Sequence, residues 1–289
     1  HVNRIFTRFE IPVFIDEKRN ALAHPFVEFL RAFLKMIEED FSYETVFRYL
    51  RSGFAGITTA EADALENYCL ALGIRGFKKY SEKWIRFSKN QTDEELTALN
   101  RIRERFYHSV KDATIILKDK NENIFRKCTS LYEFLEKLEV EKQLKIKEEE
   151  FLADGDGVTA KEYHQIFRVI MELLEKYVEL LGEEKVSLEE FSELLDAGFA
   201  EVKVGVIPPG SDRVVVGDME RTRLKDVKVL FLLGANEGNI PKSLTGGGIL
   251  SQMEREFLEE QEAFLAPTAK EQVYLQKFYI YYVLKNHSY

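Results

Sequence analysis

The stretch GIRGFKKYSEKWIRFSKN, residues 73–90, interleaves cations with aromatic rings. Only one acid, Glu82, accompanies its cations, which are Arg75, Lys78, Lys79, Lys83, Arg86 and Lys89. Ammonium and guanidinium groups pair with phosphates, and aromatic rings stack on bases; the rings here are Phe77, Tyr80, Trp84 and Phe87. The pattern therefore predicts a DNA contact. A helix that packs its rings inward and leaves its lysines in water would give the same pattern, so that alternative stays open.

The stretch ADGDGVTAKEYH, residues 153–164, resembles a calcium-binding loop but fails in register. If Asp154 and Asp156 take positions 3 and 5, Tyr163 falls at position 12, where the loop needs a bidentate carboxylate. We expect an acidic loop between helices, with Thr159 capping the second helix.

No other residues have a spacing typical of catalysis or metal binding. TGGGILS, residues 245–251, lacks the lysine and hydroxyl of a phosphate-binding loop, and the five histidines show no paired spacing. Cys69 and Cys128 lie far apart in sequence, which argues against a clustered zinc or iron–sulfur site and favours a reducing, cytoplasmic compartment. We expect no catalytic residue and no metal in this chain.

The composition is that of a folded, soluble protein. Of the 289 residues, 45% are apolar and 31% are charged, and the net charge is −9. No apolar run is long enough to span a bilayer, so no membrane contact is expected. Proteins that hold DNA by counterion release alone are more often basic, so a DNA contact here must come from a local patch.

The hydrophobic periodicity changes twice along the chain. Residues 1–16 predict a helix and then a strand, with a break at Pro12; residues from about 18 to 200 follow the helical period; and β-branched runs return after Val202. Helices are expected near 42–51, 60–72, 81–88, 93–117, 124–150, 159–181 and 188–198. Capping boxes are expected to begin at Thr58, Thr92, Thr159, Ser187 and Ser251. The pattern predicts one α/β domain split by an all-helical insertion.

A second feature is the sequence FLLGANEGNIP, residues 231–241. Its first five residues are also the last five of VKVLFLLGA, residues 227–235. That longer stretch is a continuous apolar run of the kind buried on both faces of a parallel sheet. Gly234 would allow a tight exit from that strand, Gly238 a bend, and Pro241 a stop.

Several separated motifs resemble the AddB subunits of AddAB helicase–nucleases, within the UvrD/RecB type of superfamily-one helicases. They are VVVGDMERTRLKDVKVLFLLGANEGNIPK, GGGILSQMEREFLEEQEAFLAPTAKEQVYLQKFYIYYVL, IPVFIDEKRNALAHPFVEFLRAFLKM and DALENYCLALGIRGFKKY, in the family's order. The resemblance implies an α/β fold in which a RecA-like (P-loop NTPase type) 2A domain is split by a helical 2B domain. Residues 1–16 and 203–289 would form the two parts of 2A, and residues 17–202 would form 2B.

The chain departs from the pattern of active helicases at two motifs. ERTRLKD, residues 220–226, stands where active members carry H-x-x-K-G-L-E, and Asn286 stands where motif VI supplies an arginine to the γ-phosphate of ATP. A neutral amide cannot stabilise that charge, so we expect a chain that does not hydrolyse ATP. Arg221 and Arg223 lie in ERTRLKD, at the motif V position, and are candidate DNA contacts. Ion pairs of these two arginines with Glu220 and Asp226 are an equal alternative. The loop that follows the strand expected over 227–235 would lie where an active helicase couples its nucleotide to the DNA strand. The residues of this loop are Gly234, Asn236, Glu237 and Gly238.

The resemblance also implies a role and partners. The parent would act with an AddA-type subunit on double-strand breaks for recombinational repair, and would scan the exiting strand for a hotspot sequence (Chi). The DNA that it contacts would be a single strand or a fork. ATP with magnesium and a 4Fe-4S cluster would lie outside this chain, as would the nuclease domain. Because the chain opens at His1 within an amphipathic stretch, we expect it to be part of a longer protein. Two alternatives stay open: the motor half of an active superfamily-one helicase, and a pure protein–protein scaffold.

Overall fold

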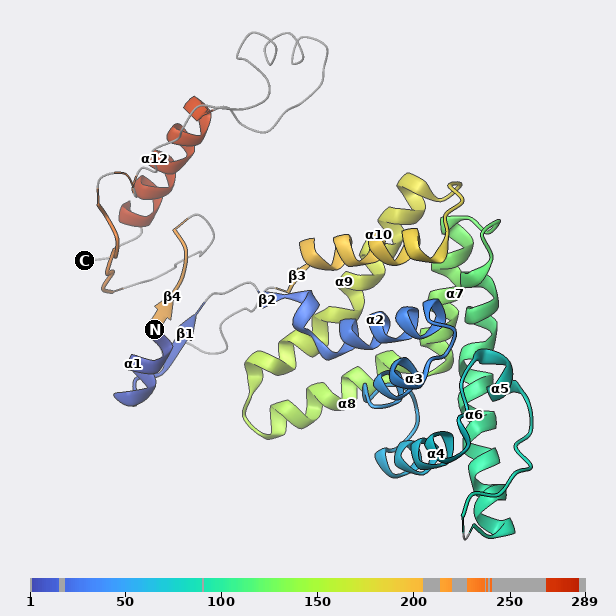
Figure 1. Ribbon diagram of the computed structural model, residues 1–289. Helices are drawn as coiled ribbons and strands as arrows, with labels where there is room; N and C mark the ends of the chain where they lie inside the picture. The colour runs from blue at the N-terminus through green and yellow to red at the C-terminus, as the bar shows by residue number, and fades with distance from the viewer. Residues whose placement is uncertain are drawn as a thin grey trace. The chain divides into compact units, whose positions relative to one another are not determined.

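The computed structural model of the chain describes residues 2–15, 19–89, 91–204, 214–219, 228–236, 238, 240 and 269–285 (Figure 1). The chain divides into two compact units. The terminal unit comprises His1–Asp16 and Gly210–Tyr289, and the helical unit comprises Glu17–Pro209. Most described residues are helical, and one small parallel sheet lies in the terminal unit.

The terminal unit pairs the first strand of the chain with a strand far along the sequence. α1 (Val2–Arg8) precedes β1 (Val13–Ile15), as predicted. β1 runs parallel to β4 (Val214–Val216), with Val13 opposite Val214, Phe14 opposite Val215 and Ile15 opposite Val216. The C-terminal part of this unit contains α12 (Ala269–Lys285).

The apolar run of the terminal unit differs from its prediction. None of residues 228–236 lies in a strand, and the side chains of Val229, Phe231 and Leu233 are 66%, 80% and 77% exposed. A strand needs a hydrogen-bonded neighbour, and within the described part of this unit β1 and β4 pair only with each other. The prediction of a strand buried on both faces is therefore wrong for these residues.

The helical unit begins and ends on a short antiparallel pair, β2 (Arg19–Asn20) and β3 (Lys203–Val204). Between these strands lie a 3-10 turn and nine described helices: η1 (Ala21–Ala23), α2 (Pro25–Glu38), α3 (Tyr43–Leu50), α4 (Thr59–Leu72), α5 (Phe77–Ser81), α6 (Asp93–Lys118), α7 (Ile124–Lys137), α8 (Val140–Ala153), α9 (Gly157–Leu181) and α10 (Leu188–Glu201).

The core of the helical unit is built around α2, which packs against α3, α6, α10 and η1. The Phe33 ring of α2 stacks on Phe134 of α7 with centroids 3.9 Å apart, and the Phe29 ring stacks on the same residue at 5.9 Å. All three rings are buried. Burial of such rings is the main favourable term for this unit, because each removes a large apolar area from water. α4 and α5 lie beside α6, the longest of the described helices (Figure 1).

Local capping signals were predicted well. The capping boxes at Thr58, Thr92 and Ser187 are confirmed at the starts of α4, α6 and α10. The box at Thr159 is wrong: α9 begins two residues earlier, and the Asp156 carboxylate accepts the Thr159 N–H at 3.0 Å. Ser251 lies outside the described residues.

Two helix predictions are also wrong in their bounds. The helix expected over 124–150 is two helices, because Glu139 adopts a left-handed backbone with φ of 52° between α7 and α8. The helix expected over 81–88 is instead α5, which ends at Ser81. The assignment of the two units to RecA-like 2A and 2B domains stays a prediction.

Candidate nucleic-acid interface

The cation-rich stretch of the sequence leaves the helical path after α5. Residues 82–89, which we call the strap, have no regular secondary structure and lead from α5 toward α6. The buried side of the strap is fixed by polar atoms of α6 and by rings of α4 and α5.

Asn100 of α6 holds the strap at Trp84 through two reciprocal hydrogen bonds. The Trp84 N–H donates to Asn100 Oδ1 at 2.9 Å, and Asn100 Nδ2 donates to the Trp84 carbonyl at 2.8 Å. The Asn100 side-chain amide thus forms hydrogen bonds with both main-chain groups of Trp84, as the backbone of a neighbouring β-strand would. Because both main-chain groups of Trp84 are used in this way, they are not available for helical bonds, which explains why the predicted helix over 81–88 does not form.

Arg103, one turn along α6, fixes the end of α5. Its side chain is 3% exposed; Nη1 donates to the Tyr80 carbonyl at 2.7 Å and Nε donates to Asn100 Oδ1 at 3.2 Å. Its third contact is an ion pair between Nη2 and Glu104 at 3.0 Å. A buried guanidinium with these partners satisfies carbonyls that a helix end leaves without intrahelical donors.

The rings of the stretch divide between the interior and the surface. Trp84 stacks on Tyr68 of α4 with centroids 4.7 Å apart, Tyr80 is fully buried, and Phe77 packs on Phe41 at 4.9 Å. The Tyr68 hydroxyl also donates to the Arg86 carbonyl at 2.7 Å, and Trp84 Nε1 donates to the Lys79 carbonyl at 2.9 Å.

The rings of Phe77, Tyr80 and Trp84 follow the alternative in which the aromatic side chains of the stretch pack inward. Phe87 does not, because it is 50% exposed.

The cations of the stretch all lie at the surface. Arg75, Lys78 and Lys79 lie in or just before α5, and the strap carries the remaining three, Lys83, Arg86 and Lys89. Lys79 forms an ion pair with Glu82 at 2.9 Å, which together with nearby Lys78 lowers the pKa of that carboxyl. No salt bridge joins the other five cations to any residue that the structure describes. These charges are therefore available to an anionic partner.

The thiols lie in the interior. Cys69 of α4 lies 3.7 Å from the Tyr80 hydroxyl behind the strap, and burial raises the pKa of its thiol to about 11. Burial raises the pKa of Cys128 to about 12. Both thiols are therefore protonated at neutral pH and poorly reactive. Among the described residues no group of three or more histidine, cysteine, aspartate or glutamate side chains is arranged to hold a metal ion.

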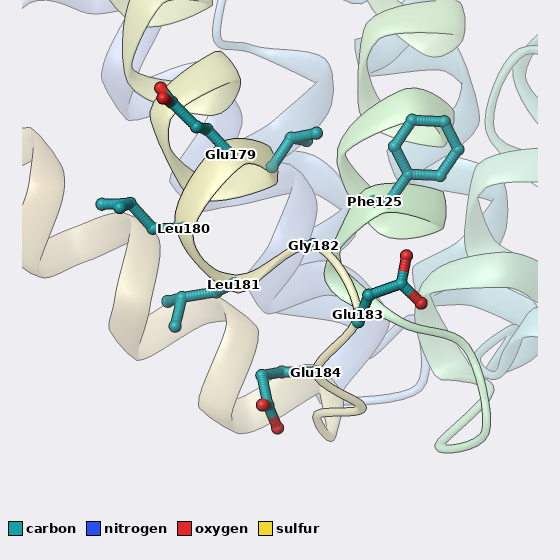
Figure 2. A pocket seen from close by; sticks show the side chains of 8 residues that line it. Phe125, Glu179, Leu180, Leu181, Gly182, Glu183 and Glu184 are labelled. Atoms are coloured by element: carbon teal, nitrogen blue, oxygen red, sulfur yellow. The ribbon is translucent and has the colours of Figure 1, made fainter.

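A second surface feature of the helical unit carries the opposite charge. A hollow of about 330 Å³ lies where the end of α9 meets the start of α7 (Figure 2). Three of its lining residues are glutamates, and the full set is Phe125, Val178, Glu179, Leu180, Leu181, Gly182, Glu183 and Glu184. We call this feature the acidic hollow. These negative charges repel a phosphate backbone.

Backbone hydrogen bonds hold the loop of the acidic hollow. The N–H groups of Ile124 and Phe125, at the start of α7, donate to the carbonyls of Glu184 at 2.9 Å and Gly182 at 3.0 Å. Asn123 caps α7 by accepting the Arg126 N–H at 2.9 Å. The loop therefore satisfies N–H groups that the helix itself cannot.

The predicted loop of the terminal unit is described only in part. Gly234 and Gly238 have φ of 74° and 84°, the left-handed conformations that their turn positions predict. The N–H of Asn236 donates to the Gly234 carbonyl at 2.8 Å, which closes the turn. The other candidates of this unit, Arg221, Arg223, Glu237 and Asn286, lie outside the described residues.

Sequence reasoning missed the residues that position the strap. Asn100 and Arg103 fall among Leu96, Leu99 and Phe106 on the buried face of α6. A buried polar side chain at such a position needs a partner, so the interruption of the apolar face was the available signal. The spacing of residues along α6 does not predict which main-chain groups Asn100 and Arg103 bind, because those groups lie far away in the sequence.

No family model matches the chain, but curated proteins do. The matching proteins are named as the B subunits of ATP-dependent helicase/deoxyribonucleases. They include those of Lachnoclostridium phytofermentans (43% identical, 94% of this chain), Clostridium acetobutylicum (35%, 99%) and Caldanaerobacter subterraneus subsp. tengcongensis (36%, 99%). This chain covers 24%, 26% and 25% of those three proteins. The chain is thus a homologue, over nearly its whole length, of about a quarter of these helicase/deoxyribonuclease B subunits, the AddB family.

Proposed function

We propose that the chain is the helicase-like region of an AddB-type subunit and contacts DNA through the strap and α5. The observation that carries this proposal is the group of exposed cations without salt bridges to described residues, held on a segment whose backbone is fixed by Asn100 and Arg103. Exposed cations on a fixed backbone pair with phosphates without first having to be ordered. The names of the homologous proteins support DNA as the anionic partner.

The proposed role is that of a scaffold and not a motor. The terminal unit would be the RecA-like 2A domain and the helical unit the 2B domain. ERTRLKD in place of motif V and Asn286 in place of the motif VI arginine support a region that does not hydrolyse ATP. Arg221 and Arg223 would add DNA contacts from the 2A side.

The proposed setting is a cytoplasmic complex that processes double-strand breaks for recombinational repair. An AddA-type subunit would be the protein partner, and the DNA would be a single strand or a fork. ATP with magnesium and a 4Fe-4S cluster would belong to other parts of the complex. No helix in the described part of the chain has the length and apolar character to cross a membrane.

The experiment that tests the DNA contact neutralises two strap cations. Lys83→Gln/Arg86→Gln is introduced into the full-length protein, and affinity for forked DNA is measured against salt concentration, with divalent metals chelated to prevent cleavage. We expect affinity to fall roughly tenfold at about 0.1 M salt, and the slope of log affinity against log salt to become shallower by about two, one for each lost phosphate contact.

The matched control is Lys145→Gln/Lys176→Gln, which removes the same charge from two exposed lysines of α8 and α9. The control is expected to keep both the affinity and the slope of the unsubstituted protein. If the strap variant and the control behave alike, the DNA contact is wrong and a pure protein–protein scaffold is the better account.

A further inference from the structure

The strap carries two exposed apolar side chains among its cations. Ile85 is 75% exposed and Phe87 is 50% exposed, whereas the Trp84 ring next to them is buried against Tyr68. Phe87 has Arg86 directly before it and Lys89 two residues after it. A ring that is not needed for the core and stands between two phosphate-pairing cations is placed as a base-stacking residue is in single-strand binding proteins.

We propose that the strap binds an unpaired DNA strand, with Phe87 stacking on a base while Lys83, Arg86 and Lys89 pair with its phosphates. This inference rests on the proposed function, because it assumes that the strap contacts DNA, and it selects the unpaired strand over the duplex.

The difference between the two DNA forms lies in what they offer to an apolar ring. In a duplex the base faces are covered by neighbouring base pairs, and the accessible surface is phosphate, sugar and groove edges. An unpaired strand exposes base faces, which stack on aromatic rings regardless of sequence. Cations alone would serve either form, so Phe87 is the residue that distinguishes them.

The strap is also held in place before DNA arrives. The Asn100 bonds to Trp84 and the Tyr68 bond to the Arg86 carbonyl fix the backbone on the N-terminal side of Phe87. An aromatic side chain has two rotatable angles, so it loses little freedom when it stacks. Both facts reduce the entropy that base stacking must overcome.

The test compares Phe87→Ala with Phe125→Ala in the full-length protein with divalent metals chelated. Phe125 is a matched control because its ring is 52% exposed on the same unit, at the acidic hollow. The probes are an oligothymidylate strand and a blunt duplex of equal length, at one salt concentration. We expect Phe87→Ala to weaken binding of the single strand roughly tenfold and to leave the duplex unchanged. Phe87→Trp should retain single-strand binding, and Phe125→Ala should change neither affinity.

Two results would overturn the inference: unchanged single-strand affinity in Phe87→Ala, or an equal loss for both probes. The Lys83→Gln/Arg86→Gln variant separates this failure from failure of the DNA contact itself. If the charge variant weakens binding and Phe87→Ala does not, only the preference for an unpaired strand is wrong. If neither variant weakens binding, both proposals fail.

Discussion

The strap and the loop of the acidic hollow are both irregular segments attached to long helices, but different atoms hold them. The strap depends on side chains, since the Asn100 amide binds the N–H and the carbonyl of Trp84 and the Tyr68 hydroxyl binds the Arg86 carbonyl. The Arg103 guanidinium binds the Tyr80 carbonyl in α5, just before the strap. The loop 182–184 depends on main-chain bonds to the start of α7. A main-chain hydrogen bond does not depend on which side chain its residue carries. A side-chain hydrogen bond is lost when that residue is substituted. The strap is therefore the more vulnerable of the two to point mutation.

The two segments also differ in charge. The strap and α5 present exposed cations in a protein of net charge −9, and the acidic hollow presents three glutamates on the same unit. A partner with phosphates is drawn to the first and repelled by the second. Substitutions at the hollow therefore serve as controls for substitutions at the strap.

The largest stability effect is expected for Asn100→Leu. It fills a similar volume but leaves the Trp84 N–H and carbonyl without partners, and each unsatisfied buried group costs about 1–3 kcal/mol. We expect a loss of roughly 3 kcal/mol in the free energy of unfolding, together with weaker DNA binding because the strap is no longer held. Denaturant unfolding and DNA titration measure the two effects.

Thr114→Val is the matched control on the same helix. Thr114 is buried, and its hydroxyl donates only within α6, to the Val110 carbonyl at 2.8 Å. It should lose less than about 1 kcal/mol and bind DNA normally. Equal losses in the two variants would mean that Asn100 contributes no more than an ordinary buried hydrogen bond.

A smaller effect is expected at the other segment. Asn123→Ala removes the side-chain cap of α7 but keeps the main-chain bonds from Ile124 and Phe125 to the loop. Loss of such a cap costs about 1 kcal/mol, and DNA affinity should not change. Thermal unfolding and DNA titration check these outcomes. A loss as large as that of Asn100→Leu would remove the contrast between side-chain and main-chain attachment.

The sequence predicted features that depend on neighbouring residues and failed where distant residues decide. The capping boxes at Thr58, Thr92 and Ser187 involve residues three apart, so spacing is sufficient to find them. The helix predicted over 81–88 failed because Asn100, sixteen residues beyond Trp84, takes both main-chain groups of that tryptophan. Residues 228–235, described within the strand predicted over 227–235, form no strand, because periodicity reports apolar character and does not supply a pairing neighbour.

The candidate site shows the same limit. The cations of residues 73–90 were identified by type and spacing, and the structure places them at the surface. Spacing did not separate the buried rings of Tyr80 and Trp84 from the exposed ring of Phe87, because that separation depends on how α4 and α6 pack against the strap. The proposed DNA contact therefore rests on Lys83, Arg86 and Phe87 more than on the stretch as a whole.

The most direct test of the DNA contact is photochemical crosslinking. The full-length protein is saturated with a single strand that carries photoreactive bases, irradiated with divalent metals chelated, digested, and analysed by mass spectrometry. Our account predicts a crosslinked peptide that includes residues 82–89, with the modified residue at Phe87 and with loss of that crosslink in Lys83→Gln/Arg86→Gln. Crosslinks at saturation that fall elsewhere, with none in residues 82–89, would contradict it.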